Sequence, residues 1–268
     1  MRRTGLLVGL LITFLLTPWW CLAETAVASE SPVRIALIID DMGYRQDAGE
    51  QALALPGKIT YSFLPHTPFA WKQAIRAHEL EREVMLHLPM ESDLGNPLGA
   101  GALTLSMPRE EFLSVLKRDL DSIPYVAGVN NHMGSLLTRD PTAMRWVMGS
   151  LREADLFFID SRTTDATVAE RVAQENLVAS ARRHVFLDYI QDREIVRKQL
   201  AALVATARRD GSAIGIGHPY PETIAVLMQE LPKLQVEGIE LVPASALTNP
   251  GRALWHASSS LLPKAAKN

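Results

Sequence analysis

Eight short apolar segments alternate with helix-like segments along the chain, and this alternation constrains the fold more than any other feature of the sequence. Their length and near-continuous hydrophobicity are typical of strands that are buried on both faces of a parallel sheet. The segments are residues 34–40, 59–64, 83–88, 125–130, 156–160, 184–187, 213–217 and 240–243. Because parallel strands need crossover connections, their succession predicts repeated β-α units.

Helical patterns fill the stretches between these strands. Residues 108–122 begin with proline and acidic residues and then carry apolar residues at helical spacing, and residues 192–209 end in a cationic turn before Gly211. The remaining helix-like segments are 142–154, 167–175 and 221–231. About seven or eight β-α units in one chain predict an α/β fold, a (β/α) barrel that is either complete or incomplete. An open doubly wound sheet is the alternative.

Residues 1–23 have the pattern of an export signal. Arg2 and Arg3 precede an uncharged apolar stretch, and a small-residue cleavage site ends at Ala23. The alternative is an uncleaved membrane anchor, because about 20 uncharged residues can span a bilayer. The pattern predicts a periplasmic or otherwise exported protein, which would contact a membrane only through this segment if it is not cleaved.

The composition agrees with an exported globular protein. Cys21 is the only cysteine of the 268 residues, so cleavage leaves a thiol-free chain, which suits an oxidising compartment and excludes thiol catalysis. The formal net charge of −3 argues against a nucleic-acid partner, which selects basic surfaces. We expect a flexible lead-in over residues 24–33, one folded domain over residues 34–248 and a disordered tail over residues 249–268.

Acidic residues and histidines recur where the predicted strands finish. In a parallel barrel the carboxyl ends of all strands open on one rim, where the sites of such folds lie. One polar residue at a strand end more often caps a helix or a loop, but their recurrence in one chain predicts a functional site. The candidates are Asp40, Asp41, His87, His132, Asp160, Asp188 and His218.

Asp40 and Asp41 are adjacent carboxylates at the end of the first strand. They repel each other unless a cation or a proton lies between them. Side chains alternate along a strand, so both can face one ligand only if the backbone turns there, and Gly43 makes such a turn easy. A divalent metal would leave one Asp as ligand and the other as a base, whereas the alternative is a turn with a helix N-cap.

Each histidine allows more than one interpretation. His87 in an apolar strand is either a hydrogen-bonded core residue or a ligand. His132 lies in a segment of turn-forming residues that would hold a metal ligand rigidly, or is an incidental turn histidine. His218 is a general acid, a metal ligand or a plain loop residue. Asp160 and Asp188 either fix the orientation and tautomer of these histidines or cap the loops that follow them.

Five short motifs occur in order along the chain: residues 38–44 (IIDDMGY), 87–91 (HLPME), 130–135 (NNHMGS), 158–161 (FIDS) and 216–219 (IGHP). Together they resemble the divergent polysaccharide deacetylase family of exported bacterial proteins. The resemblance runs from about Arg34 to Leu247. It implies a distorted (β/α) barrel related to the carbohydrate deacetylases of the NodB-homology type.

The resemblance also implies an activity and roles for the residues. The chain would be a metal-dependent hydrolase that removes acetyl groups from an N-acetylated envelope glycan. Asp40 would be the base and His218 the acid. Asp160 is placed with these catalytic residues because of its position at a strand end, and not by the resemblance. A divalent metal, zinc before others, would be held by Asp41, His132 and His87.

Two features depart from the relatives' pattern. The motif His-Ser/Thr-x-x-His and the arginine-proline-tyrosine motif are both absent, and His87 and His218 could exchange roles. A non-catalytic glycan-binding or envelope-interaction protein on the same barrel is therefore the alternative, because a fold does not entail an activity.

Overall fold

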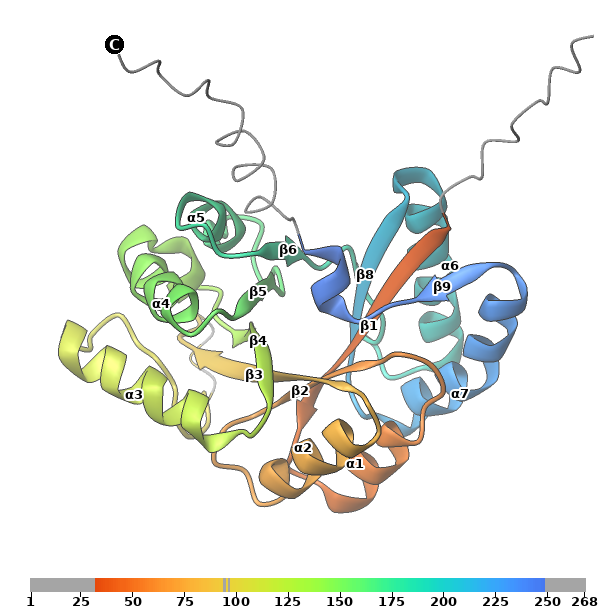
Figure 1. Ribbon diagram of the computed structural model, residues 1–268, viewed down its shortest axis with the longest axis horizontal. Helices are drawn as coiled ribbons and strands as arrows, with labels where there is room; N and C mark the ends of the chain where they lie inside the picture. The colour runs from red at the N-terminus through yellow and green to blue at the C-terminus, as the bar shows by residue number, and fades with distance from the viewer. Residues whose placement is uncertain (1–31, 94, 96, 249–268) are drawn as a thin grey trace, which may run out of the picture. The chain divides into compact units, whose positions relative to one another are not determined.

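Strands and helices alternate through residues 32–248, without 94 and 96, which are the residues described by this computed structural model (Figure 1). The strands are β1 (Val33–Met42), β2 (Thr60–Phe63), β3 (Glu83–Met90), β4 (Val126–Met133), β5 (Phe157–Asp160), β6 (Ser180–Arg182), β7 (Val185–Phe186), β8 (Ser212–Gly217) and β9 (Ile239–Leu241). The helices are α1 (Gln46–Leu53), α2 (Ala70–Glu79), α3 (Arg109–Ser122), α4 (Pro141–Glu153), α5 (Ala169–Glu175), α6 (Arg193–Asp210) and α7 (Pro221–Val236), with 3₁₀ turns η1 (Leu137–Arg139) and η2 (Ala244–Leu247).

The strands form one parallel sheet that curls into an open barrel. Its order is β6-β5-β4-β3-β2-β1-β8-β7, and β9 pairs with β1. Within the described ranges no pairing joins β6 to β7, so the barrel is incomplete. The helices lie around the outside of the curled sheet (Figure 1). This arrangement confirms the incomplete (β/α) barrel rather than the open doubly wound sheet.

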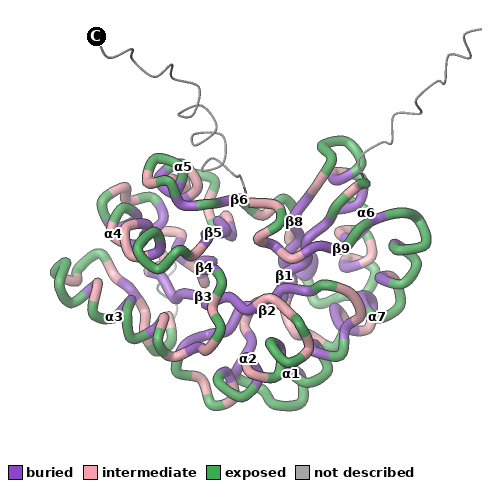
Figure 2. The backbone as a smooth tube through the Cα atoms, in the orientation of Figure 1, coloured by how far each residue is buried: buried purple, intermediate pink, exposed green. Residues whose placement is uncertain are grey.

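Side chains alternate between the outer and the inner side of the barrel, as the period of a strand requires. In β1, Ile35, Leu37 and Ile39 belong to a large core shared with the helices, whereas Ala36 and Ile38 belong to a smaller core inside the barrel. Figure 2 shows the buried residues concentrated along the strands and the exposed ones on the helices. The sheet is thus buried on both faces, which explains its continuous apolar segments.

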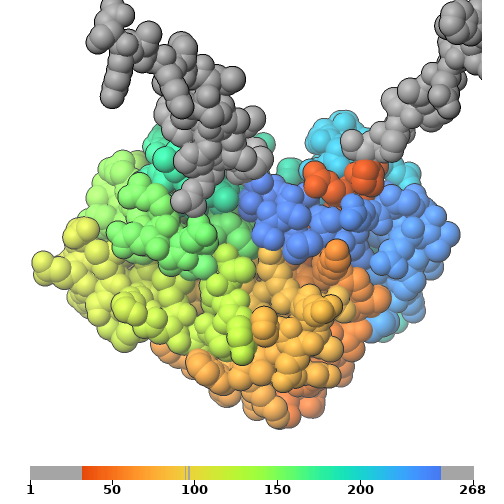
Figure 3. All heavy atoms as spheres, in the orientation of Figure 1, coloured from red at the N-terminus to blue at the C-terminus, as the bar shows by residue number. Residues whose placement is uncertain are grey.

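The last described residues close the amino end of the barrel. Ala244 packs into the inner core, and its N–H group donates to Oγ1 of Thr60 at 3.0 Å. The N–H group of Ser245 donates to Oε1 of Glu83 at 3.1 Å. Since Thr60 and Glu83 begin β2 and β3, η2 covers the starts of these strands. The space-filling view shows this segment, in dark blue, between the orange and green parts of the chain (Figure 3).

The observed elements extend the predicted ones in a way that matters for the site. Every predicted strand segment overlaps a strand, but β6 and the helices α1 and α2 were missing from the prediction. The strands β3 and β4 continue to Met90 and Met133, beyond their predicted ends. His132 consequently lies inside a strand, as His87 does, and the turn expected at His132 falls on Met133 (φ 52°) and Gly134 (φ 89°).

The terminal predictions lie outside the described residues. These are the export signal over residues 1–23, most of the lead-in and the tail over residues 249–268. Within the described part, β1 begins at Val33. No helix in that part of the chain is long and apolar enough to cross a membrane.

Candidate metal centre at the carboxyl end of the barrel

The inward-facing rows of the barrel change from apolar to polar as the strands approach their carboxyl ends. In β1 the row Ala36 and Ile38 ends at Asp40, and in β3 Met85 is followed by His87. Along β8 the buried Ile216 precedes His218. The inner core therefore fills the lower part of the barrel, and titratable groups gather above it.

A bulge brings the two adjacent carboxylates to the same place. The register between β1 and β2 shifts between Ile39 and Met42, and Asp41 has a left-handed backbone (φ 55°). The turn that the sequence placed at Gly43 thus begins at Asp41 itself. Gly43 continues it (φ 109°), and a Cβ atom there would lie 2.2 Å from Oγ1 of Thr67, so only glycine fits.

Asp41, His87 and His132 form a tight cluster whose potential ligand atoms all lie within 4.8 Å of one another. Oδ1 of Asp41 lies 3.1 Å from Nδ1 of His132 and 3.3 Å from Nε2 of His87. The two imidazole nitrogens are 3.1 Å apart. Three atoms with lone pairs therefore converge on one small volume, from strands β1, β3 and β4.

Asn130 fixes the tautomer of His87. Oδ1 of Asn130 accepts a hydrogen bond from Oγ of Ser62 at 2.6 Å and lies 2.8 Å from Nδ1 of His87. A carbonyl oxygen only accepts, so Nδ1 of His87 carries a proton, and Nε2 presents its lone pair to the cluster whenever the ring is neutral. Nδ2 of Asn130 donates to Oδ1 of Asp40 at 2.8 Å. The sequence predicted Asn130 at the end of a strand, beside turn-forming residues, and missed this role.

The cluster fits a divalent metal ion. Oδ1 of Asp41 is buried and accepts no hydrogen bond of good geometry from the described residues, although two ring nitrogens lie close to it. An unsatisfied buried carboxylate oxygen is costly unless a cation compensates it. One carboxylate and two imidazoles are also a ligand set that leaves a further position open for water or substrate.

The environment separates the pKa values of the two carboxylates. Burial raises the pKa of Asp40, and the positive charges of His87 and His218 oppose this only in part. Burial would also raise the pKa of Asp41, but the close approach of the His132 and His87 rings lowers it strongly. Neighbouring carboxylates with divergent pKa values are typical of a pair in which one is a proton acceptor and the other a permanent anion.

His218 completes the cluster on its β8 side and is oriented by Asp188. Its Nδ1 lies 2.9 Å from Oδ1 of Asp188, and its backbone N–H group donates to Oδ2 at 2.7 Å. Nε2 points toward Oδ2 of Asp41, 3.8 Å away. Burial would lower the pKa of His218, but the hydrogen bond and the charge of Asp188 raise it.

Asp160 does not join this cluster through any hydrogen bond found in the described residues. Oδ1 of Asp160 accepts from the N–H group of Arg162 at 2.8 Å, and Oδ2 accepts from Oγ1 of Thr167 at 2.9 Å. These are the contacts of a loop cap, which was the alternative to its placement among the catalytic residues. The carboxylate that orients a histidine is Asp188, and the side chain that orients His87 is Asn130.

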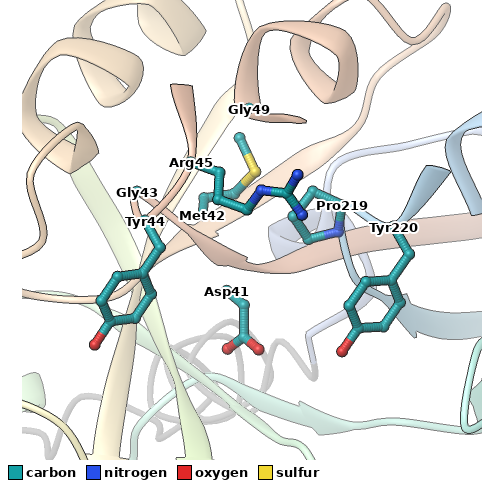
Figure 4. Close-up of a pocket in the computed structure, with 8 residues that line it drawn as sticks. All are labelled: Asp41, Met42, Gly43, Tyr44, Arg45, Gly49, Pro219 and Tyr220. Atoms are coloured by element: carbon teal, nitrogen blue, oxygen red, sulfur yellow. The ribbon is translucent and has the colours of Figure 1, made fainter. Parts of the chain in front are cut away.

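Two hollows flank Asp41 and Asp40. The outer hollow, of about 140 Å³, is lined by Asp41, Met42, Tyr44, Arg45, Pro219 and Tyr220, among others. Figure 4 shows the rings of Tyr44 and Tyr220 on either side of the Asp41 carboxylate. The inner hollow, of about 360 Å³, is lined by Asp40, His132, Ser161, Arg162, Arg183 and His218, among others. The cluster is thus reachable from two sides.

The profile of the family described as divergent polysaccharide deacetylase matches residues 37–248. The chain belongs to this family. The match covers all the described strands except the first residues of β1, and with it every residue of the cluster, and it confirms the resemblance drawn from the five motifs.

The chain is also similar to three known proteins. The chain is 40% identical over 226 residues to the uncharacterized protein YibQ of Escherichia coli strain K12, covering 83% of this chain and 70% of that one. It is 37% identical over 209 residues to an uncharacterized protein of Haemophilus influenzae strain KW20, covering 78% and 74%. The crystal structure of the uncharacterized protein ATU2773 from Agrobacterium tumefaciens C58 superposes with a TM-score of 0.78 at 24% identity, covering 82% and 91%, and shares the fold.

Proposed function

We propose that the chain is a metal-dependent hydrolase that removes acetyl groups from an N-acetylated glycan. One observation carries the proposal: a metal-fitting cluster of Asp41, His87 and His132 lies between a buried carboxylate, Asp40, and an oriented histidine, His218. Family membership supports the same chemistry. Metal-assisted amide hydrolysis uses a Lewis acid, a base and an acid around one carbon atom, and the site offers candidates for all three.

Asp41, His87 and His132 would hold the metal, with zinc as the first candidate because it favours this mixed set of nitrogen and oxygen ligands. When bound, such an ion polarises the acetyl carbonyl and lowers the pKa of a water molecule toward about 7. Asn130 keeps His87 in the tautomer that coordination requires.

Asp40 and His218 would move the protons. Asp40 accepts the proton of the attacking water, and burial prepares it for this because it raises the pKa of the carboxyl group. The water oxygen bonds to the acetyl carbon, and the carbon–nitrogen bond then breaks. His218, whose pKa Asp188 raises, donates its proton to the departing amine, so that acetate and a free amino sugar result.

The proposed location of the substrate is the cell envelope. The basic start and apolar stretch of residues 1–23 support export, which would bring the domain to envelope glycans. N-acetylated sugars of such glycans carry the amide bond that this chemistry cleaves.

The test compares the wild type with Asp40→Asn. We expect the purified wild type to contain one metal ion by elemental analysis and to release acetate from N-acetylated oligosaccharides. Asp40→Asn should keep the metal and lose at least about 100-fold in rate, because it removes the base and leaves the ligands. The same substitution at exposed Asp47 is the control. Folded wild type that binds no metal and releases no acetate from any glycan tested would contradict the proposal, and glycan binding without turnover would favour the binding alternative.

A further inference from the structure

Arg183 lies beside the cluster without taking part in it. It follows β6 and lines the inner hollow together with Asp40, His132 and His218. The hollow has the volume of a small-molecule site. A ligand in the inner hollow therefore lies next to this side chain.

The guanidinium of Arg183 is held in a fixed position. Its Nε donates to the backbone oxygen of Ser161 at 2.7 Å, and its Nη2 donates to that of Arg162 at 2.8 Å. Its Cζ also lies 4.9 Å from the centre of the Phe186 ring. Two of the five N–H groups are used in this way, so three remain for a ligand. The loop that supplies both carbonyls is itself capped by Asp160.

The charge of Arg183 has no direct counter-ion. Within the described residues no carboxylate lies within 4.0 Å of its guanidinium, whereas its neighbour Arg162 pairs with Asp165 at 3.0 Å. Burial lowers the pKa of Arg183, and the charges of Asp40, Asp160 and Asp165 oppose this only in part. A fixed, half-buried cation of this kind is suited to receive an anion.

We infer that Arg183 forms a carboxylate-binding subsite in the inner hollow, next to the metal centre. The inference rests on the proposed function and names the class of substrate: an N-acetylated sugar that also carries a carboxylate. The free N–H groups of the guanidinium match the two oxygens of a carboxylate in a paired arrangement. Acetate, the product of the proposed hydrolysis, carries the same carboxylate group and is the other ligand that fits this subsite.

The experiment measures binding, so it does not depend on turnover. The full chain is treated with a chelator, because a bound metal would itself attract acetate, and is titrated by NMR with three probes. These are the methyl glycosides of N-acetylmuramic acid and N-acetylglucosamine, which differ by a lactyl carboxylate, and sodium acetate. We expect the wild type to bind the acidic glycoside about tenfold more tightly than the neutral one.

Two variants of equal charge separate the subsite from general electrostatics. Arg183→Gln should reduce the preference to less than about twofold, because the paired donor is lost. Arg182→Gln removes a cation from the adjacent, exposed position and should keep the preference. Three results would overturn the inference. The wild type could bind both glycosides with equal affinity, the preference could survive in Arg183→Gln, or it could be lost in both variants. Acetate binding that depends on Arg183 without any preference between the glycosides would overturn the substrate class and assign the subsite to the product.

Two further measurements keep the test decisive if Arg183→Gln does not fold. Arg183→Lys keeps the charge without the paired donors and should retain part of the preference. In the wild type, the preference should fall as NaCl rises from about 0.05 to 0.5 M. Acetate release is assayed separately: a preference that depends on Arg183 in a protein without hydrolytic activity would reject the proposed function alone, and hydrolysis without the preference would reject the subsite alone.

Discussion

Nδ1 of His87 lies 2.8 Å from Oδ1 of Asn130, its partner in the register between β3 and β4. The amide group of Asn130 also donates to Asp40, so one side chain connects a potential metal ligand with the proposed base. Ser62 supports the same amide oxygen from β2. The four inner strands thus share a buried polar network whose orientation is set before any ligand arrives.

Asn130→Ala should weaken metal binding by about 10–100-fold, because His87 loses the acceptor that fixes its tautomer and ring orientation. The measurement is a competition titration with a chromophoric chelator. Asn176→Ala is the control, since that amide donates to a carbonyl oxygen of α5, in the helical layer outside the barrel. Unchanged metal affinity in Asn130→Ala would show that the network does not prepare the ligand.

The pH dependence of hydrolysis should report on Asp188. Burial would lower the pKa of His218, but Asp188 raises it, so the acid stays protonated above the usual range of histidine. Activity is lost as the pH rises through this pKa, because the leaving amine then receives no proton. Asp188→Asn removes the raising effect, and we expect the basic limb of kcat/KM to move to lower pH.

The matched control for this prediction is Asp192→Asn, which changes a carboxylate at the N-cap of α6. It should leave the basic limb in place. A loss of activity in Asp188→Asn that is equal at every pH would instead assign Asp188 a purely structural role, through its bond to Oγ1 of Thr223.

The rings of Tyr44 and Tyr220 flank the Asp41 carboxylate and offer apolar faces to a sugar (Figure 4). Tyr44 is 52% exposed, whereas Tyr220 stacks on the imidazole of His218. Tyr44→Ala should raise KM for an N-acetylated oligosaccharide about three- to tenfold with little change in kcat, because stacking stabilises the bound substrate and the transition state alike. Tyr125→Ala, at the amino end of β4, should change neither constant. A fall in kcat at unchanged KM would contradict this role.

The sequence predicted the gathering of the site because strand order and direction decide where the carboxyl ends of parallel strands lie. Asp41, His87 and His132 come together from three strands for that reason. The sequence did not predict which side chains orient them. Whether an amide, a carboxylate or a loop carbonyl faces a given histidine depends on register and rotamer, which residue types alone do not determine.

The same limit explains the two misplaced features. Asn131 and His132 follow the predicted strand in a segment of turn-forming side chains, yet they continue β4, because pairing with β3 outweighs local propensity. Asp160 ends β5 as predicted, but its carboxylate faces its own loop and not the barrel. Arg183 carries no motif at all, and only the tertiary structure places it in the inner hollow.

Asp119 provides a prediction for stability that is independent of the site. Its side chain is fully buried, and Oδ1 lies 2.8 Å from Nε2 of His66. Burial raises the pKa of Asp119, and the hydrogen bond and charge of His66 offset this only in part, so that it reaches about 7 instead of 3.8. The folded state therefore binds this proton more tightly than the unfolded state does.

The sign of the effect follows from this difference. The contribution of protonated Asp119 to the free energy of unfolding is fully present below pH 3.8 and is lost as the pH rises through about 7. Asp119→Asn cannot titrate, so the stability difference between this variant and the wild type should shift in favour of the variant by up to about 1.4 kcal/mol per pH unit over this interval. Urea unfolding at several pH values measures it. The control is Asp121→Asn, on the exposed side of α3 beside Lys117, which should show no such trend. If the stability difference between Asp119→Asn and the wild type stays constant with pH, Asp119 is already ionised in the folded protein over this whole interval.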